Sequence, residues 1–221
     1  MLIIMKESQS GFWKSLRQMV MVTVILMLVC GLGFPLLLTG LSALLFPQQA
    51  SGNLITVDGK TVGSVSVGQE FTEDYFLWSR PSAYHYNVYT ETEDGQRYYL
   101  DGTTFGGLAS GSQNYGPSNP ALAERVEADI QNFLEKNPEV EREEIPTDLL
   151  TASGSGLDPH ISPMAAQIQV PRIAQASGLT EDKVQEIIQN HTTGKLLGIF
   201  GEETGNVLQV NVEIAKCMGI L

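Results

Sequence analysis

A short stretch of the chain, TASGSGLDPHISP at residues 151–163, gathers residue types that carry much enzyme chemistry. It holds an aspartate, a histidine and three serines beside two glycines, and a proline lies on each side of the histidine. Four interpretations compete: part of a catalytic triad, a metal site, a phosphate-binding loop, or a rigid surface for another protein. The surrounding sequence decides between them.

A serine hydrolase needs a nucleophile, a base and an orienting acid that converge in space. The necessary side chains are present at Ser153, Ser155, Asp158 and His160. However, the GSG segment is not the G-x-S-x-G elbow that exposes a nucleophilic serine. Asp158 and His160 are also separated only by the rigid Pro159, which disfavours a shared proton path to a neighbouring serine. We therefore expect no catalytic residue here.

Metal binding and phosphate binding have no better support. The three histidines, at positions 85, 160 and 191, form no ligand pair at helical spacing, so we expect no metal site. A phosphate-binding loop combines glycines with a lysine and a serine or threonine. The segments SGSGLDPH and GLASGSQNYGPS have the glycines but lack the lysine, so we also expect no bound cofactor.

The remaining interpretation is structural. Glycine permits backbone conformations and close approaches that other residues resist, and proline fixes the local geometry. Asp158 can accept hydrogen bonds from the backbone of the following turn. The sequence therefore predicts a stiff polar loop that leads into a helix and either holds the domain together or docks a neighbour.

The N-terminal part of the chain contains a long uncharged run. Residues 19–46 carry no acidic or basic side chain, and about 20 apolar residues suffice to span a bilayer as a helix. Pro35 lies within this run, where we expect a kink or a break. A cleaved signal peptide is the alternative, but its apolar region is only about 7–15 residues long.

The charges around this run predict its orientation. Lys6, Lys14 and Arg17 precede it, whereas the first charge after it is Asp58. The positive-inside rule places the N-terminus in the cytoplasm. We therefore predict a cytoplasmic tail at residues 1–18, a single transmembrane helix at 19–46 and an extracytoplasmic domain at 47–221.

The predicted outer domain is strongly acidic. The whole chain holds 25 acidic and 13 basic residues, and three of the basic residues precede the apolar run. An acidic surface repels polyanions, so we expect no nucleic-acid partner, while the apolar run contacts the lipid bilayer. The two cysteines, Cys30 in the run and Cys217 near the C-terminus, are not expected to pair.

Strand signals come first in the outer domain. We expect a flexible exit from the membrane at residues 47–53, and the alternation of residues 54–68 around Asp-Gly-Lys predicts a β-hairpin. A second hairpin is expected around Asp94-Gly95. Residues 195–215 are predicted to form two further strands around a glycine-rich turn.

Helix signals follow between these strands. Asn119 and Pro120 predict the start of a helix that stops before Pro138. A second helix is expected from Ser162 to Gly178, with a kink or break at Pro171, and a third follows the N-cap Thr180. Because strands and helices are interspersed, we predict an α/β domain, with α+β as an alternative.

Several segments together resemble one family. They are RPSA at residues 80–83, GPSNPAL at 116–122, TASGSGLDPHISPMAAQIQVPRIA at 151–174 and HTTGKLLGIFGEETGNVLQVNVEIA at 191–215. With the single N-terminal membrane helix, they resemble the KdpC family of the bacterial Kdp potassium-transporting ATPases. The resemblance covers nearly the whole chain. Residues 86–108 look like an insertion, and GEETGN replaces a usual Pro-Arg-Val-like stretch.

The resemblance implies a noncatalytic subunit of a high-affinity potassium pump in the bacterial cell membrane. Its implied partners are KdpA, which is channel-like, KdpB, which is the P-type ATPase, and a small fourth protein where present. ATP is used by KdpB, and the family is described as its catalytic chaperone. Because the predicted topology separates the domain from cytoplasmic nucleotide, we expect any effect on ATP to be indirect. An independent membrane-anchored hydrolase or sensor is the alternative.

The residues that match the family's segments are our candidates for structural or interface roles. They are Arg80, Pro81, Ser82, Gly116, Pro117, Ser118, Asn119, Ser153, Gly154, Ser155, Gly156, Asp158, Pro159 and His160.

Overall fold

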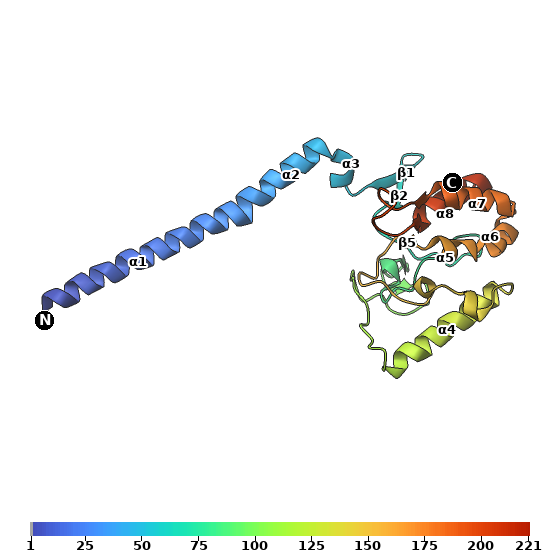
Figure 1. Cartoon of the computed structure of the whole chain (residues 1–221), viewed down its shortest axis with the longest axis horizontal. Helices are drawn as coiled ribbons and strands as arrows, with labels where there is room; N and C mark the ends of the chain where they lie inside the picture. The colour runs from blue at the N-terminus through green and yellow to red at the C-terminus, as the bar shows by residue number, and fades with distance from the viewer. Residues whose placement is uncertain (1) are drawn as a thin grey trace. The chain divides into compact units, whose positions relative to one another are not determined.

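The computed structural model describes residues 2–221, with side chains from residue 11 onward. The chain forms two compact units, of which the first ends at Asn53 and the second comprises Leu54–Leu221 (Figure 1). The first unit is helical and the second mixes helices with short strands. Every strand pair in the second unit is antiparallel, so the domain has the α+β form of the predicted mixed class.

The first unit consists mainly of one long helical run. It comprises α1 (Leu2–Leu28), the π-helical segment η1 (Val29–Gly33) and α2 (Phe34–Leu45) (Figure 1). The part from Gly11 to Leu45 is long and apolar enough to cross a membrane, and none of its most apolar window is buried in the protein. This is the property that a lipid-facing helix requires.

The helix accommodates Pro35 by changing its hydrogen-bond pattern. Proline removes a backbone donor and its ring collides with the carbonyl one turn earlier. Just before Pro35 the helix widens, and the N–H of Phe34 donates to the carbonyl of Val29. The expected kink or break is thus a π-helical turn.

The expectation of a flexible exit at residues 47–53 was wrong in part. Residues Pro47–Ala50 form the short helix α3, and the N–H of Ala50 donates to the carbonyl of Phe46 over 2.9 Å. Proline is well suited to the first position of a helix, which explains this extra turn.

The second unit begins with the first predicted hairpin. Strands β1 (Leu54–Val57) and β2 (Lys60–Ser64) pair across a two-residue turn. The turn residues Asp58 and Gly59 have φ of 49° and 78°, as a type I′ turn requires. The prediction of this hairpin is confirmed.

The second predicted hairpin is also confirmed. Strand β3 (Tyr89–Glu91) pairs with β4 (Arg97–Tyr99) around a turn that contains Gly95 at a φ of 74°. The hairpin lies within the expected insertion, residues 86–108. Asn87 closes the base of this segment, because its side chain both donates to and accepts from the backbone of Ala109 over 2.9 Å.

A three-stranded sheet joins distant parts of the second unit. Its order is β5 (His160–Ile161), β7 (Thr204–Asn206) and β6 (Thr192–Thr193). The central strand β7 brings the C-terminal region beside the 151–163 loop, since His160 pairs with Asn206. The sheet thereby fixes the end of that loop.

The helices start at the predicted capping residues. Helix α4 (Pro120–Lys136) is capped by the side chain of Asn119, α5 (Pro163–Gln167) by Ser162, and α7 (Glu181–Asn190) by Thr180. Helix α6 (Val170–Ser177) follows a break just before Pro171 and ends at Gly178 in the left-handed conformation. Short 3₁₀ turns lie at η2 (His85–Asn87), η3 (Arg142–Glu144) and η4 (Thr147–Leu149).

The prediction of two strands over residues 195–215 was wrong. Only β7 is extended, and the chain closes with the helix α8 (Val207–Met218). Asn206 caps α8 by accepting a hydrogen bond from the N–H of Gln209 over 3.0 Å. Val210, Val212 and Ile214 alternate with polar residues, a pattern that favours a strand, although the segment is a helix whose two faces are both largely buried.

The core lies between the C-terminal helices and α4 (Figure 1). Ile173 of α6, Val184 of α7 and Ile214 of α8 are completely buried, and Phe133 of α4 packs into the same cluster. The buried Asn211 of α8 also holds the distant segment around Leu77. Its side chain accepts from the N–H of Leu77 over 2.7 Å and donates to the Leu77 carbonyl over 2.9 Å.

Candidate interaction site

The 151–163 loop is held by the segment Arg80–Ser82. The Arg80 guanidinium lies 3.0 Å from the Asp158 carboxylate and also donates to the Thr151 carbonyl over 3.3 Å. The Ser82 hydroxyl donates to the Gly156 carbonyl over 2.7 Å. Two segments singled out by the sequence are thus joined by side-chain contacts.

Tyr86 reinforces this junction. Its hydroxyl lies 3.0 Å from the Arg80 carbonyl and 3.3 Å from the Asp158 carbonyl, where it can donate. Burial, with a smaller contribution from the Asp158 charge, raises the pKa of Tyr86 to about 12. The phenol therefore stays a neutral donor. Its ring packs against Gly68, whose N–H donates to the Leu157 carbonyl over 2.9 Å.

Gly156 is required by the shape of the loop. Its φ is 65°, a left-handed conformation that glycine adopts without a steric penalty. A Cβ at this position would also collide with the carbonyl oxygen of Gly111. Gly111 is itself bound to the loop, because its N–H donates to the Ser155 carbonyl over 2.6 Å.

The loop serines act as backbone caps. The Ser153 hydroxyl accepts from the N–H of Gly156 over 2.9 Å, and the Ser155 hydroxyl accepts from the N–H of Leu157 over 3.1 Å. Such side-chain bonds stabilise tight turns. Both hydroxyls therefore have a structural role.

Asp158 and His160 form a local pair. One carboxylate oxygen of Asp158 accepts from the N–H of His160 over 3.0 Å and lies 3.5 Å from its Nδ1. The other ring nitrogen lies 3.5 Å from the side-chain nitrogen of Asn206. Among the described residues, no hydrogen bond joins His160 to Ser153 or Ser155, so these groups do not assemble into a catalytic triad.

The segment Gly116–Asn119 is built differently. Its residues are exposed, and the N–H of Asn119 donates to the Gly116 carbonyl over 2.9 Å. The side chain of Asn119 accepts from the N–H of Ala121 over 3.0 Å and begins α4. In the part of the chain that the structure describes, no hydrogen bond links this segment to the 151–163 loop.

The 151–163 loop borders a groove of about 710 Å³. Sequence reasoning missed several of its residues, because they come from separate parts of the chain with no shared motif. Its charged lining residues are Arg80, Asp148, Asp158, Lys195, Glu202 and Glu203. Asp148 is anchored by Ser162, whose N–H and hydroxyl lie 2.7 and 3.1 Å from the carboxylate. Acids outnumber bases in this groove.

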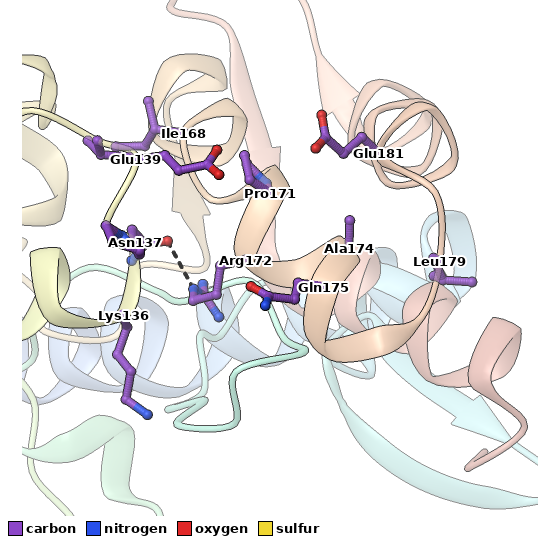
Figure 2. Close-up of a pocket in the computed structure, with 12 residues that line it drawn as sticks. Lys136, Asn137, Glu139, Ile168, Pro171, Arg172, Ala174, Gln175, Leu179 and Glu181 are labelled. Atoms are coloured by element: carbon purple, nitrogen blue, oxygen red, sulfur yellow. Dashed lines mark hydrogen bonds between the residues drawn. The ribbon is translucent and has the colours of Figure 1, made fainter.

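A second pocket, of about 460 Å³, lies between the end of α4 and α6 (Figure 2). Arg172 lines this pocket, and its Nε donates to Asn137 over 3.1 Å and its Nη2 to Gln169 over 2.7 Å. Its guanidinium carbon lies 4.0 Å from the Trp78 ring centre. Burial lowers the pKa of Arg172 to about 10, which still leaves it charged at neutral pH.

This second pocket therefore belongs to the framework of the domain. Arg172 also donates to the carbonyls of Asp74 and Phe76, over 2.5 and 3.0 Å. Gln169 accepts from the N–H of Trp78 over 2.9 Å. These side chains fix residues 74–78, which lead directly to Arg80. The positions of Gln169 and Arg172 in the sequence do not indicate that these side chains hold residues 74–78 in place.

Comparisons with known proteins assign the family. The family described as "KdpC: K+-transporting ATPase, c chain" matches residues 16–216. The chain is 49% identical over 211 residues to the potassium-transporting ATPase KdpC subunit of Clostridium kluyveri, covering 96% of this chain and 98% of the relative.

Other relatives agree. Identity is 51% over 213 residues with the KdpC subunit of Clostridioides difficile, covering 94% of this chain and 100% of the relative. With the KdpC subunit of Bacillus cereus it is 40% over 204 residues, covering 92% of this chain and 96% of the relative. The resemblance inferred from the motifs is confirmed, and the chain belongs to the KdpC family, the c chains of K+-transporting ATPases.

Proposed function

We propose that this chain is the noncatalytic KdpC component of an ATP-driven potassium-uptake complex in the bacterial cell membrane. The observation that carries the proposal is the family match across residues 16–216. In this proposal the chain assembles with the channel-like KdpA, the P-type ATPase KdpB and, where present, a small fourth protein. It stabilises the assembly and acts as a catalytic chaperone of KdpB.

The domain is proposed to lie outside the cytoplasm. Support comes from Lys14 and Arg17, which lie in α1 just before its uncharged run, and from the absence of charged residues between Arg17 and Asp58. In this proposal KdpB hydrolyses ATP on the cytoplasmic side. The chain therefore affects ATP affinity through the conformation of the complex, as two sites coupled at a distance do.

The 151–163 loop supports a docking role over an independent hydrolase. Ser153 and Ser155 cap the backbone, and Asp158 is paired with Arg80. These interactions stiffen the loop, and a stiff surface loses little conformational entropy when a partner binds. The loop is thus suited to recognition by shape.

Purification of the complex tests this function. The tagged chain, extracted from native membranes in mild detergent, should bring KdpA and KdpB with it. A complex prepared without the chain should show a higher KM for ATP or fall apart, and the purified chain alone should hydrolyse neither ATP nor simple esters. Hydrolysis by the chain alone, without co-purifying pump proteins, would contradict the proposal.

Thiol labelling tests the orientation separately. Cys217 is exposed on the domain, so a membrane-impermeant maleimide should label it in intact cells. In a Cys217→Ser background, the variant Ser10→Cys should be labelled only after lysis. The reverse pattern would place the domain in the cytoplasm and allow direct contact with nucleotide.

A further inference from the structure

The connection between β6 and β7 carries an unusual apolar tip, residues 196–200, which we call the apolar finger. Its four apolar residues are strongly exposed: Leu196 by 69%, Leu197 by 81%, Ile199 by 76% and Phe200 by 61%. Single exposed apolar residues are common on protein surfaces, but a contiguous group marks an interaction site. The finger therefore needs a partner.

The finger has a defined conformation. Leu196 and Phe200 exchange two backbone hydrogen bonds, of 2.8 and 3.0 Å, and the N–H of Gly198 donates to the Lys195 carbonyl over 3.0 Å. Leu197 has a φ of 56°, which is strained for a residue with a side chain. The turn thus keeps the Leu197 side chain exposed although the backbone of Leu197 is strained. A preformed turn loses less entropy on binding.

The base of the finger is continuous with the candidate site. Lys195 on one side and Glu202 and Glu203 on the other line the groove beside the 151–163 loop. Asp148 adds a further acid, and the positive charge of Arg80 is already paired within the site. The resulting surface combines a projecting apolar tip with a mostly acidic groove. Its complement is an apolar pocket with a basic rim.

We infer that the apolar finger inserts into an apolar pocket with a basic rim on another protein of the same membrane complex. This inference rests on the proposed function, which supplies the partner proteins. A lipid surface fits less well, because Glu202 and Glu203 beside the tip are repelled by anionic headgroups and would lose hydration at the interface. A second copy of the chain would bring two acidic grooves together, which like charges oppose.

Substitution of the finger tests the inference in the full-length chain. The double variant Leu197→Ser/Ile199→Ser should reduce co-purification of the other pump proteins about tenfold or more, because it removes apolar surface that the partner's pocket would bury. Its thermal unfolding midpoint should be unchanged, since both side chains are exposed in the free chain. The matched control is Leu108→Ser, which changes a leucine outside the finger that is 83% exposed, and this variant should co-purify normally.

The outcomes separate the inference from the proposed function. If the wild-type chain brings no pump protein with it, the proposed function fails. If the wild-type chain and the double variant co-purify equally well, the function stands and the apolar finger is not the docking element. The double variant Glu202→Gln/Glu203→Gln should make association with the pump proteins less dependent on salt concentration. An unchanged salt dependence would show that the partner's pocket has no basic rim.

Crosslinking identifies the occupant directly. A benzophenone-bearing amino acid at position 197, activated by light in native membranes, should form an adduct with another protein of the pump. Adducts only with lipid or with a second copy of the chain, or no adduct at all, would overturn the inference.

Discussion

The 151–163 loop and the segment Gly116–Asn119 contain similar residues but have different structural roles. Both are rich in glycine, serine and proline, and both match segments of the family. The loop is bound by side chains and backbone from other parts of the domain, among them Gly68, the segment Arg80–Ser82 and Gly111. The segment makes local hydrogen bonds and starts a helix.

Two glycines, one from each region, illustrate the difference. Gly156 has a left-handed backbone and lies against Gly111, whereas no atom within 4 Å would meet a Cβ at Gly116. Composition is therefore a poor guide to how tightly a segment is held. The surrounding structure decides which glycine can be replaced.

Gly156→Val should have the largest effect. Valine at a φ of 65° is strained, and its Cβ would collide with the Gly111 carbonyl, so we expect a loss of about 3 kcal/mol in unfolding free energy. Denaturant unfolding of the detergent-solubilised chain, followed by circular dichroism, measures it, and potassium uptake by the assembled complex should fall. Gly154→Val is the control in the same loop, where a Cβ meets nothing. Equal losses for both variants would show that the Gly156 contact is unimportant.

Removing the ion pair should have the next largest effect. Arg80→Ala leaves the Asp158 carboxylate and the Thr151 carbonyl without their partner, and we expect a cost of about 2 kcal/mol. About a quarter of each charged side chain is exposed, so solvent limits the loss. A double-mutant cycle with Asp158→Asn should give a coupling of about 1 kcal/mol. A coupling near zero would show that the two segments are held by packing alone.

The exposed segment should respond only through its helix cap. Asn119→Ala removes the hydrogen bond to the N–H of Ala121 and should cost about 1 kcal/mol in unfolding free energy. Ser118→Ala, one residue earlier and exposed, should change it by less than about 0.5 kcal/mol. If instead Ser118→Ala disrupts the complex while the chain stays folded, the segment is itself an interface.

The smallest effects are expected for the groups that resemble catalytic residues. Ser153→Ala and Ser155→Ala each remove one capping bond and should cost about 1 kcal/mol or less. His160→Gln keeps hydrogen-bonding capacity and should also be tolerated. Potassium uptake and co-purification, measured together, should stay near wild type. Loss of transport in a fully assembled complex would revive a chemical role for the loop.

Much of the secondary structure was predictable because its signals are local. The Asp58-Gly59 turn and the caps at Asn119, Ser162 and Thr180 are formed within a few residues, so a short window contains their cause. Helix α8 escaped prediction for the opposite reason. Its cap, Asn206, was not recognised, and Val210, Val212 and Ile214 alternate with polar residues as in a strand.

The sequence by itself determined the long apolar helix, the hairpin turns and the helix caps at Asn119, Ser162 and Thr180, since each depends on neighbouring residues. Only the tertiary structure placed Arg80 against Asp158, 78 positions away, and Tyr86 within reach of both. It also assigned Gln169, Arg172 and Asn211 to the support of residues 74–78. Such contacts arise from how the helices pack. The spacing of residues along the chain does not indicate which distant side chains this packing brings within hydrogen-bonding distance.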